Sequence, residues 1–356
     1  MRGNIVGVRL RYLLLAASLC AFSMPAGAQK LERRGQATQL AVDGKTMLVL
    51  GGELGNSSAS TREDLAPVWE RMRALNLNTL LVPVSWELVE PKEGQFDFTL
   101  VDGILADARA HDMRIVPLWF GSWKNSMSTY VPAWVKRDSK RFPRIADAKG
   151  NPVEILSPLS TTTREADTRA FAAFMRHLKA VDSKQRTVIM VQVENEVGML
   201  PDAREHGALG DKAWADAVPA ELAKAMRGNK PTMPGWMVDR WRQNGARERG
   251  TWSELFGNDE AAQEIFTAWS LARFVESLAA AGKREYDIPL FVNAALARSG
   301  VKPGAYPSGG PLAHLTGVWQ IGAPSIDLLA PDIYFPDFAA RTADYAAINA
   351  LFIPEA

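Results

Sequence analysis

The chain has 356 residues, of which 47% are hydrophobic, 23% charged and 9% aromatic, which is typical of a globular protein rather than of a disordered, collagenous or coiled-coil chain. Lysine and arginine total 41 against 40 aspartate and glutamate residues, so no charge excess indicates a nucleic-acid partner or an acidic tail. Four histidines and one cysteine are too few for a His/Cys zinc site of ordinary spacing.

Residues 1–28 have the pattern of a secretory signal peptide. Three arginines precede a short apolar run over residues 12–22, and Ala26-Gly27-Ala28 is a small-residue cleavage site. A membrane anchor is the weaker alternative, because the run is too short to span a bilayer. A lipoprotein attached through Cys20 is weaker still, since Leu19 stands where a small residue is needed. We expect cleavage before Gln29, secretion to the periplasm or outside the cell, and no membrane contact afterwards.

Cleavage there changes the mature protein in two ways. It removes three arginines and no acids, so the net charge goes from +1 to −2. It also removes the only cysteine, so the mature chain has no disulfide and no thiol nucleophile. We therefore expect residues 29–356 to form one domain that is held by its hydrophobic core alone.

Short apolar runs bounded by turn residues predict seven strands. They cover residues 47–51, 79–84, 114–118, 188–193, 289–292, 326–330 and 351–354. Because the runs are almost continuously apolar, they predict a parallel sheet with both faces covered.

Helical periodicity lies between these strands. Leu65, Val68, Trp69, Met72 and Leu75 keep the three-four spacing of one buried stripe in a helix that Ser60 or Thr61 can cap. Further helices are predicted over residues 100–110, 164–181 and 259–281. Repeated strand–helix units indicate a (β/α)₈ TIM barrel or a doubly wound open sheet. The turn after the first strand lacks the G-x-G-x-x-G order of the open sheet, which favours the barrel.

Two long connections follow predicted strands, on the side where barrel enzymes carry their sites. They cover residues 197–258 and 294–325 and are rich in Gly, Pro and Trp, with a short helix possible over 219–226. The sequence stops at Ala356, directly after the seventh predicted strand. We therefore expect a barrel domain over residues 29–356 that lacks its eighth strand and closing helix.

Carboxylates follow two of the predicted strands. Glu194 and Glu196 end the fourth strand and Glu355 ends the seventh. At the mouth of a barrel, burial can raise one carboxyl pKa enough to make a general acid while a second stays ionised. Two such groups about 5–5.5 Å apart define retaining glycoside hydrolysis. From the pattern alone, a structural hydrogen-bonding role stays open for each glutamate.

Several segments resemble the β-galactosidase families 35 and 42 of the glycoside hydrolases. Residues 192–198 (QVENEVG) match the strand-four motif of family 35 closely, and residues 78–98 are similar to the strand-two signature. Residues 330–334 and 352–356 resemble strand six and the nucleophile segment of a bacterial branch of family 35. The resemblance covers roughly residues 45–356 and implies a (β/α)₈ barrel that hydrolyses terminal β-galactosides without a metal or organic cofactor.

The resemblance also implies residue roles. Glu196 is the expected acid/base, Glu355 the expected nucleophile, and Asn195 the expected hydrogen-bond partner of the sugar 2-hydroxyl. Strict strand alternation puts Asn195 and Glu196 on opposite faces, so both can reach substrate only if the strand ends near Asn195. For Glu194 we expect a salt-bridged position in the barrel, because burial without a partner is costly.

Other residues at strand ends are candidates for substrate binding. Where the commoner family 35 pattern has Cys-Ala-Glu-Trp after strand three, this chain has Trp123 and Asn125, which we expect to take its place. The full set of candidates is Asn195, Trp86, Trp123, Asn125, Tyr334, Asn293 and Glu53. For the two tryptophans a core position is an equal alternative. For Glu53 turn formation is the stronger alternative. Tyr334 is expected to orient Glu355.

The main functional hypothesis is therefore a retaining β-galactosidase whose partner is a carbohydrate substrate. The alternative from another class is a carbohydrate-binding barrel fragment without catalysis. A third hypothesis is an aldolase that uses Lys124 as a Schiff-base lysine, against which a solvated surface cation is the better interpretation of that residue.

Overall fold

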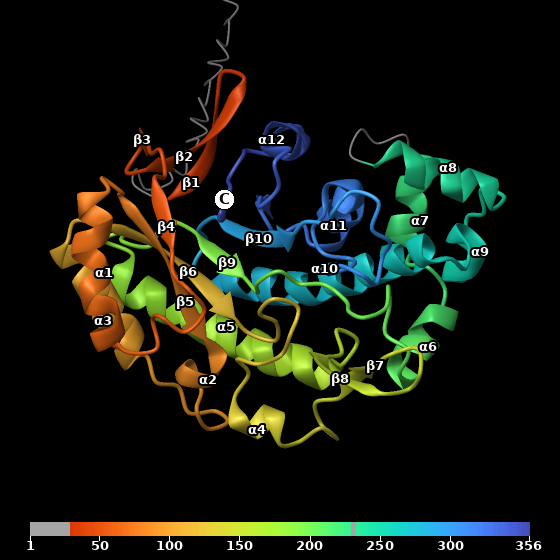
Figure 1. The fold of residues 1–356 in the computed structure, drawn as a ribbon, viewed down its shortest axis with the longest axis horizontal. Helices are drawn as coiled ribbons and strands as arrows, with labels where there is room; N and C mark the ends of the chain where they lie inside the picture. The colour runs from red at the N-terminus through yellow and green to blue at the C-terminus, as the bar shows by residue number, and fades with distance from the viewer. Residues whose placement is uncertain (1–28, 229–232) are drawn as a thin grey trace, which may run out of the picture.

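A curved sheet of six parallel strands organises the chain (Figure 1). The computed structural model describes residues 29–228 and 233–356, so the expected signal peptide lies outside the described residues. The strand order is β11-β10-β9-β6-β5-β4. Their bounds are Gly51–Glu53 for β4, Thr79–Ser85 for β5, Arg114–Phe120 for β6, Val191–Val193 for β9, Leu290–Ala295 for β10 and Leu328–Asp332 for β11. Six of the predicted strands are thus present, with ends shifted by a few residues.

The two faces of the sheet pack into two separate apolar clusters. Leu80, Val82 and Val84 of β5 pack in the large cluster with the helices, whereas Leu81 packs in a smaller cluster. That smaller cluster joins alternate residues of neighbouring strands, including Val116, Leu118, Phe120, Phe291, Leu328 and Ala330. Burial on both faces explains the almost continuously apolar strand sequences. The smaller cluster, on the face away from the helices, is called the concave cluster here. It corresponds to the interior of a barrel wall.

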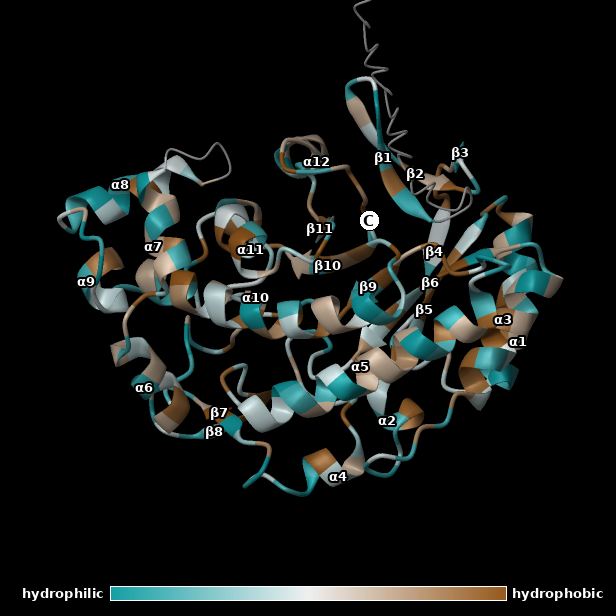
Figure 2. Cartoon of the chain, turned by 180° about the vertical axis from the view of Figure 1, so that it is seen from behind, coloured by the Kyte–Doolittle hydropathy of each residue, from teal (hydrophilic) through white to brown (hydrophobic). Residues whose placement is uncertain are grey.

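Four long helices cover the outer face, as their periodicity predicts. They are α1 (Arg62–Ala74), α3 (Thr99–Ala110), α5 (Thr161–Asp182) and α10 (Glu260–Glu285), and α5 lies against α10 (Figure 1). Polar and apolar residues lie side by side along these helices (Figure 2). Thr61 caps α1, accepting a 3.1 Å hydrogen bond from the Asp64 amide. The expected stripe is one residue too long, because Leu75 follows the helix and is 66% exposed.

The long connections contain more helix than the sequence predicts. After β9 come α6 (Ala208–Ala215), α7 (Ala220–Arg227), α8 (Gly235–Gln243) and α9 (Trp252–Phe256). After β10 come η1 (Ala313–Leu315) and α11 (Thr316–Gly322), and α12 (Phe338–Ala346) follows β11. The connections after β5 and β6 hold α2 (Trp86–Val89), α4 (Ala133–Lys136) and the hairpin β7 (Arg144–Ala146) with β8 (Pro152–Leu156). Over the described residues, no helix has the length and apolarity that crossing a membrane requires.

An N-terminal antiparallel sheet lies against the end of the barrel sheet and was not predicted. It consists of β1 (Lys30–Arg34), β2 (Ala37–Val42) and β3 (Lys45–Thr46). Leu40 and Val42 from β2 complete the concave apolar cluster. The turn between β2 and β3 has positive φ at Asp43 and Gly44, 54° and 72°. An Asp-Gly pair favours this hairpin turn, so a sequence signal was present.

The prediction of a seventh strand over residues 351–354 is wrong, because no strand ladder forms there. The segment nevertheless runs beside β11, since the Ile333 amide donates a 2.9 Å hydrogen bond to the Glu355 carbonyl. The ring of Phe352 meets Phe291 edge-on, with centroids 5.0 Å apart. Side-chain burial therefore holds the segment where backbone pairing does not. The first strand also begins later than predicted, which places Glu53 at the end of β4.

The packing of α5 against α10 gives a test of core tightness. A Cβ added at Gly282 of α10 would lie 2.4 Å from Cε1 of the buried Phe171. We expect Gly282→Ala to lower the free energy of unfolding by roughly 1–2 kcal/mol, because overpacking outweighs the gain of about 1 kcal/mol in helix propensity.

The matched control is Gly103→Ala in α3. Its added Cβ would meet only the flexible end of the exposed Arg62 side chain. Urea unfolding should show this variant unchanged or more stable than the wild type. Equal effects of the two substitutions would contradict the proposed tight contact at Phe171.

Candidate active site

Four carboxyl groups from distant parts of the chain meet at the C-terminal ends of the parallel strands. Glu53 ends β4, Glu196 follows β9, Asp332 ends β11 and Glu355 lies in the C-terminal segment. The charges of the other three carboxylates each raise the pKa of Asp332, after burial, which is the largest cause. Such coupling requires close approach, so the sequence-predicted pair Glu196 and Glu355 belongs to one cluster.

Glu196 lies in an environment that favours the protonated form of its carboxyl group. It is 7% exposed, and burial raises its pKa above the usual range, with a further contribution from the charge of Glu355. Lys124 and the side-chain amide of Asn125 oppose this shift. Asn125 Nδ2 donates a hydrogen bond to Glu196 Oε2, and the Glu196 backbone N–H donates to Asn293 Oδ1 over 2.9 Å. The carboxyl group is thus both poised to donate a proton and fixed in place.

A hairpin turn after β6 holds Glu196 from the other side. Lys124 and Met127 exchange backbone hydrogen bonds of 2.8 and 3.0 Å, and Asn125 and Ser126 between them have positive φ of 50° and 59°. This is the geometry of a type I′ turn. Ser126 Oγ donates a 2.6 Å hydrogen bond to the Glu196 carbonyl. The turn therefore serves as a rigid support for the acid.

The fourth strand ends before Asn195, which is the condition for Asn195 and Glu196 to reach the same region. β9 ends at Val193, and both Glu194 and Glu196 have positive φ, 61° and 45°. This backbone costs energy for non-glycine residues, and outside contacts maintain it. One such contact is the 3.2 Å hydrogen bond from the backbone N–H of Asn195 to the backbone carbonyl of Trp123. The turn thus brings Asn195 and Glu196 toward the same region.

Glu194 is not salt-bridged, contrary to expectation. Its two oxygens accept hydrogen bonds from the backbone amides of Ser122 (3.1 Å) and Trp123 (2.8 Å), and the Asp167 carboxyl group lies beside it. Asp167 accepts from Trp119 Nε1 over 2.9 Å and from Ser122 Oγ over 2.6 Å. Burial, then the charge of Asp167, raises the pKa of Glu194 well above its usual value. Backbone amides and a raised pKa, which favours the protonated form, thus take the place of the expected cation.

Glu355 accepts a hydrogen bond from one side chain and lies beside a second carboxyl group. Tyr334, which is 64% exposed, donates its hydroxyl hydrogen to Glu355 Oε2. The Glu53 carboxyl group lies beside it, and the pKa of Glu53 is raised to about 9 by burial first and by the neighbouring Glu355 next. At neutral pH Glu53 therefore holds a proton that it can donate toward Glu355.

The remaining predicted residues divide between the site and the core. Asn293 bridges Glu196 to Asp332, because its Nδ2 donates to Asp332 Oδ2 over 2.7 Å. Trp86 is fully buried, donates from Nε1 to Glu90 and packs edge-on against Trp134. Trp123 is 1% exposed and packs edge-on against Phe274 of α10, with ring centroids 4.5 Å apart. Both indoles are thus core residues, which leaves them no open face for a sugar.

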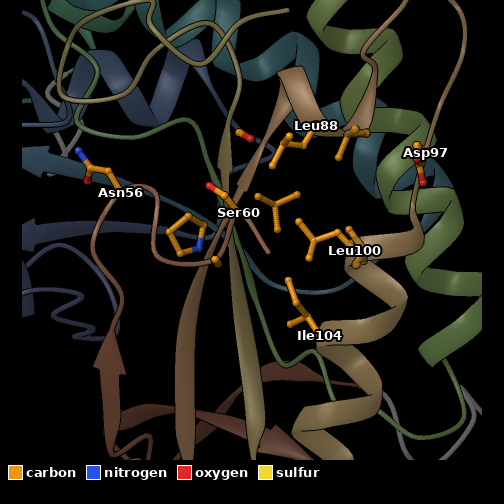
Figure 3. A pocket seen from close by; sticks show the side chains of 12 residues that line it. Asn56, Ser60, Leu88, Asp97, Leu100 and Ile104 are labelled. Atoms are coloured by element: carbon orange, nitrogen blue, oxygen red, sulfur yellow. The ribbon is translucent and has the colours of Figure 1, made fainter. Parts of the chain in front are cut away.

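A small pocket lies beside the site but on the helix side of β5 (Figure 3). Leu88, Leu100 and Ile104 line it, together with Asn56 from the loop after β4. Its volume of about 20 Å³ is enough for one water molecule and too small for a sugar ring. Asn56 connects it to the site, donating a 3.2 Å hydrogen bond to Asn125 Oδ1.

Sequence reasoning did not single out Asp332, Ser126 and Asp167, and it treated Lys124 as a solvated cation, whereas Lys124 is 5% exposed. Asp332 has a visible signal, because it follows the predicted strand over 326–330 and precedes Tyr334 by two residues. The other three act through a turn or a helix far away in sequence, so no local pattern reveals them. Among the described residues, no group of three or more His, Cys, Asp or Glu side chains is arranged to hold a metal ion.

The coupling between Glu196 and Glu355 can be measured directly. Glu355→Gln removes the charge that helps to raise the pKa of Glu196, so the Glu196 pKa should fall in this variant. Carboxyl ¹³C NMR titration would measure it. The control is Glu221→Gln, which changes an exposed glutamate of α7. An unchanged Glu196 pKa in Glu355→Gln would mean that the two groups do not interact.

The Glu194–Asp167 pair predicts a pH-dependent stability. Folding raises both pKa values, so the folded state keeps a proton that the unfolded state releases. Stability therefore falls as the pH rises above the unfolded carboxyl values near 4, and Glu194→Gln should make this fall shallower. Glu194→Ala should cost roughly 3 kcal/mol, because it leaves buried partners unsatisfied. Urea unfolding at pH 5 and pH 8 would check both, and an unchanged pH slope in Glu194→Gln would count against a raised pKa of Glu194 in the folded state.

Comparison with known proteins gives a consistent picture. Residues 58–221 match the model of glycoside hydrolase family 42, which is described as β-galactosidase. A β-galactosidase from Xanthomonas manihotis is 29% identical over 191 residues, which cover 49% of this chain and 28% of that protein. The chain thus spans less than a third of the length of this curated relative.

Two solved structures have a similar fold. The β-galactosidase from the psychrophilic Marinomonas ef1 has a TM-score of 0.52 at 13% identity, covering 81% of this chain and 41% of that one. The catalytic mutant of Gan42B, a family 42 β-galactosidase from G. stearothermophilus, has a TM-score of 0.52 at 18% identity, covering 80% and 40%. At these identities the likeness concerns the fold alone, and it confirms the expected barrel architecture. Residues 58–221 of this chain thus resemble the glycoside hydrolase family 42 β-galactosidase domain in sequence, and the chain resembles family 42 structures in fold.

Proposed function

We propose that this protein is a retaining glycoside hydrolase that cleaves terminal β-D-galactosides, with Glu196 as acid/base and Glu355 as nucleophile. The observation that carries the proposal is the meeting of two glutamates from distant parts of the chain. Glu196 follows β9 and has a raised pKa, and Glu355 of the C-terminal segment accepts a hydrogen bond from Tyr334. The choice of galactose rests on the family 42 match. Between the β-galactosidase families 35 and 42 we favour the bacterial branch of family 35, because residues 192–198 match its strand-four motif.

The two carboxyl groups divide the work of double displacement. In the first step a Glu355 oxygen forms an ester bond to C1 of the sugar, the bond from C1 to the leaving oxygen breaks, and Glu196 gives its proton to that oxygen. In the second step Glu196 takes a proton from water, the water oxygen bonds to C1, and the ester bond breaks. Two inversions at C1 retain the β configuration. The Tyr334 and Glu53 contacts orient Glu355 for attack.

Secretion is part of the proposal and rests on residues 1–28 alone. After cleavage the enzyme would act on soluble or cell-wall carbohydrate outside the cytoplasm, without nucleic-acid or membrane partners. It would need no metal or organic cofactor, because the two glutamates supply both the proton transfers and the nucleophile.

Hydrolysis of nitrophenyl β-D-galactoside by the chain tests the activity. Glu355→Gln should lose about 10⁴-fold or more in kcat, because no nucleophile remains. Glu196→Ala should lose about 10²–10⁴-fold on this substrate, and less on a dinitrophenyl galactoside, whose leaving group needs no proton. Azide, which needs no general base, should restore turnover of Glu196→Ala on the dinitrophenyl substrate.

The control is Glu221→Ala on the surface of α7, which should keep the wild-type rate. Full activity in both active-site variants would refute the assignment. Binding of galactosides in calorimetry without any turnover by the wild type would instead favour the non-catalytic carbohydrate-binding alternative.

A further inference from the structure

Lys124 is a buried cation to which the proposed mechanism gives no role. It occupies the first position of the type I′ turn after β6 and is 5% exposed. Its ammonium group donates a 2.9 Å hydrogen bond to Asn195 Oδ1 and lies 5.0 Å from the centroid of the Phe120 ring. A lysine that gives up most of its hydration needs such compensation, so the contact with Asn195 is a built feature of the site.

The lysine fixes which end of the Asn195 amide faces it. An ammonium group has three donors and no acceptor, so only the carbonyl oxygen of the amide can meet it. The Asn125 backbone N–H, also a pure donor, points at the same oxygen over a longer 3.3 Å. The Asn195 Nδ2 group must therefore face away from the turn. It is buried and has no hydrogen-bond partner among the described residues.

An unpartnered buried amide donor is costly, and a substrate can remove that cost. Nδ2 can donate to an oxygen of a bound sugar but cannot accept from it. A 2-hydroxyl group can accept such a hydrogen bond. A 2-deoxy position has nothing to accept it, and a 2-acetamido position offers its own N–H donor there.

We propose that Lys124 is a positioning residue that holds the Asn195 amide with its N–H directed at the sugar, and so makes the site selective for a 2-hydroxyl over a 2-deoxy or 2-acetamido sugar. This inference rests on the proposed function. It assigns a selectivity role to a residue that touches Asn195 rather than the reacting atoms.

Lys124 also influences the carboxyl cluster, and the test must separate this effect. Its charge lowers the pKa values of Glu53 and Glu196, so its removal would change turnover through the acid as well. The effect on Glu196 acts alike on substrates that share one leaving group. The ratio of kcat/KM for nitrophenyl β-D-galactoside to kcat/KM for its 2-deoxy analogue cancels it. The same ratio also cancels any loss of folded protein, because both substrates meet one preparation.

The experiment measures this ratio for the wild type, Lys124→Met, Lys124→Arg and Asn195→Ala. Asn195→Ala should lower the ratio by about tenfold or more, the cost of one hydrogen bond made in the transition state. Lys124→Met should lower it by a similar factor, and the double variant should lower it no further, because both changes remove one contact. Lys124→Arg keeps a donor toward Oδ1 and should keep most of the ratio. Lys179→Met, on the exposed surface of α5, is the matched control for losing a lysine.

An unchanged ratio in Lys124→Met beside a lowered ratio in Asn195→Ala would overturn the inference and leave the proposed function standing. Additive losses in the double variant would also overturn it, because the two residues would then act separately. A wild-type protein that neither hydrolyses nor binds either galactoside would overturn the proposed function, and this inference with it.

Discussion

The candidate site depends on a short stretch of backbone that cannot hold its shape alone. Glu194 and Glu196 have left-handed φ values, which disfavour side chains other than glycine. The support comes from residues 122–126, whose backbone and side chains hydrogen-bond the turn at Glu194, Asn195 and Glu196 in succession. Glu196 is therefore positioned by a neighbouring loop, and the hydrogen bonds from Ser122 to Asp167 anchor that loop to α5.

Crowded carboxyl groups set the electrostatics of the site. Taking a charge out of water is costly, and several like charges together raise the cost further, so burial in such a cluster raises carboxyl pKa values. Glu53 and Glu196 both show this rise. Glu355 accepts a hydrogen bond from Tyr334, and the protonated Glu53 lies beside it. The proposed function gives these two glutamates, Glu196 and Glu355, opposite roles in unlike surroundings, one as proton donor and one as nucleophile.

Local sequence patterns predicted some elements of this fold correctly and others wrongly. The apolar runs of β5 and β6 and the periodicity of α1, α3, α5 and α10 follow from local pattern, and the structure has them within a few residues. The segment over 351–354 misled the prediction, because an apolar run signals burial and not backbone pairing. Trp86 and Trp123 misled it in a similar way. Their places at strand ends fit either a sugar platform or the core, and packing against Trp134 and Phe274 decides for the core.

The sequence by itself determined the alternation of strands and helices and the pairing of Glu196 with Glu355 as candidates, because both are local patterns of residue type. Only the tertiary structure decided what surrounds them. The contacts of Glu196 with Asn125 and Asn293, of Glu194 with Asp167, and of Asn195 with Lys124 join residues 27 to 97 positions apart. Protonation and amide orientation depend on burial and on such neighbours, which come together only when the strands align side by side.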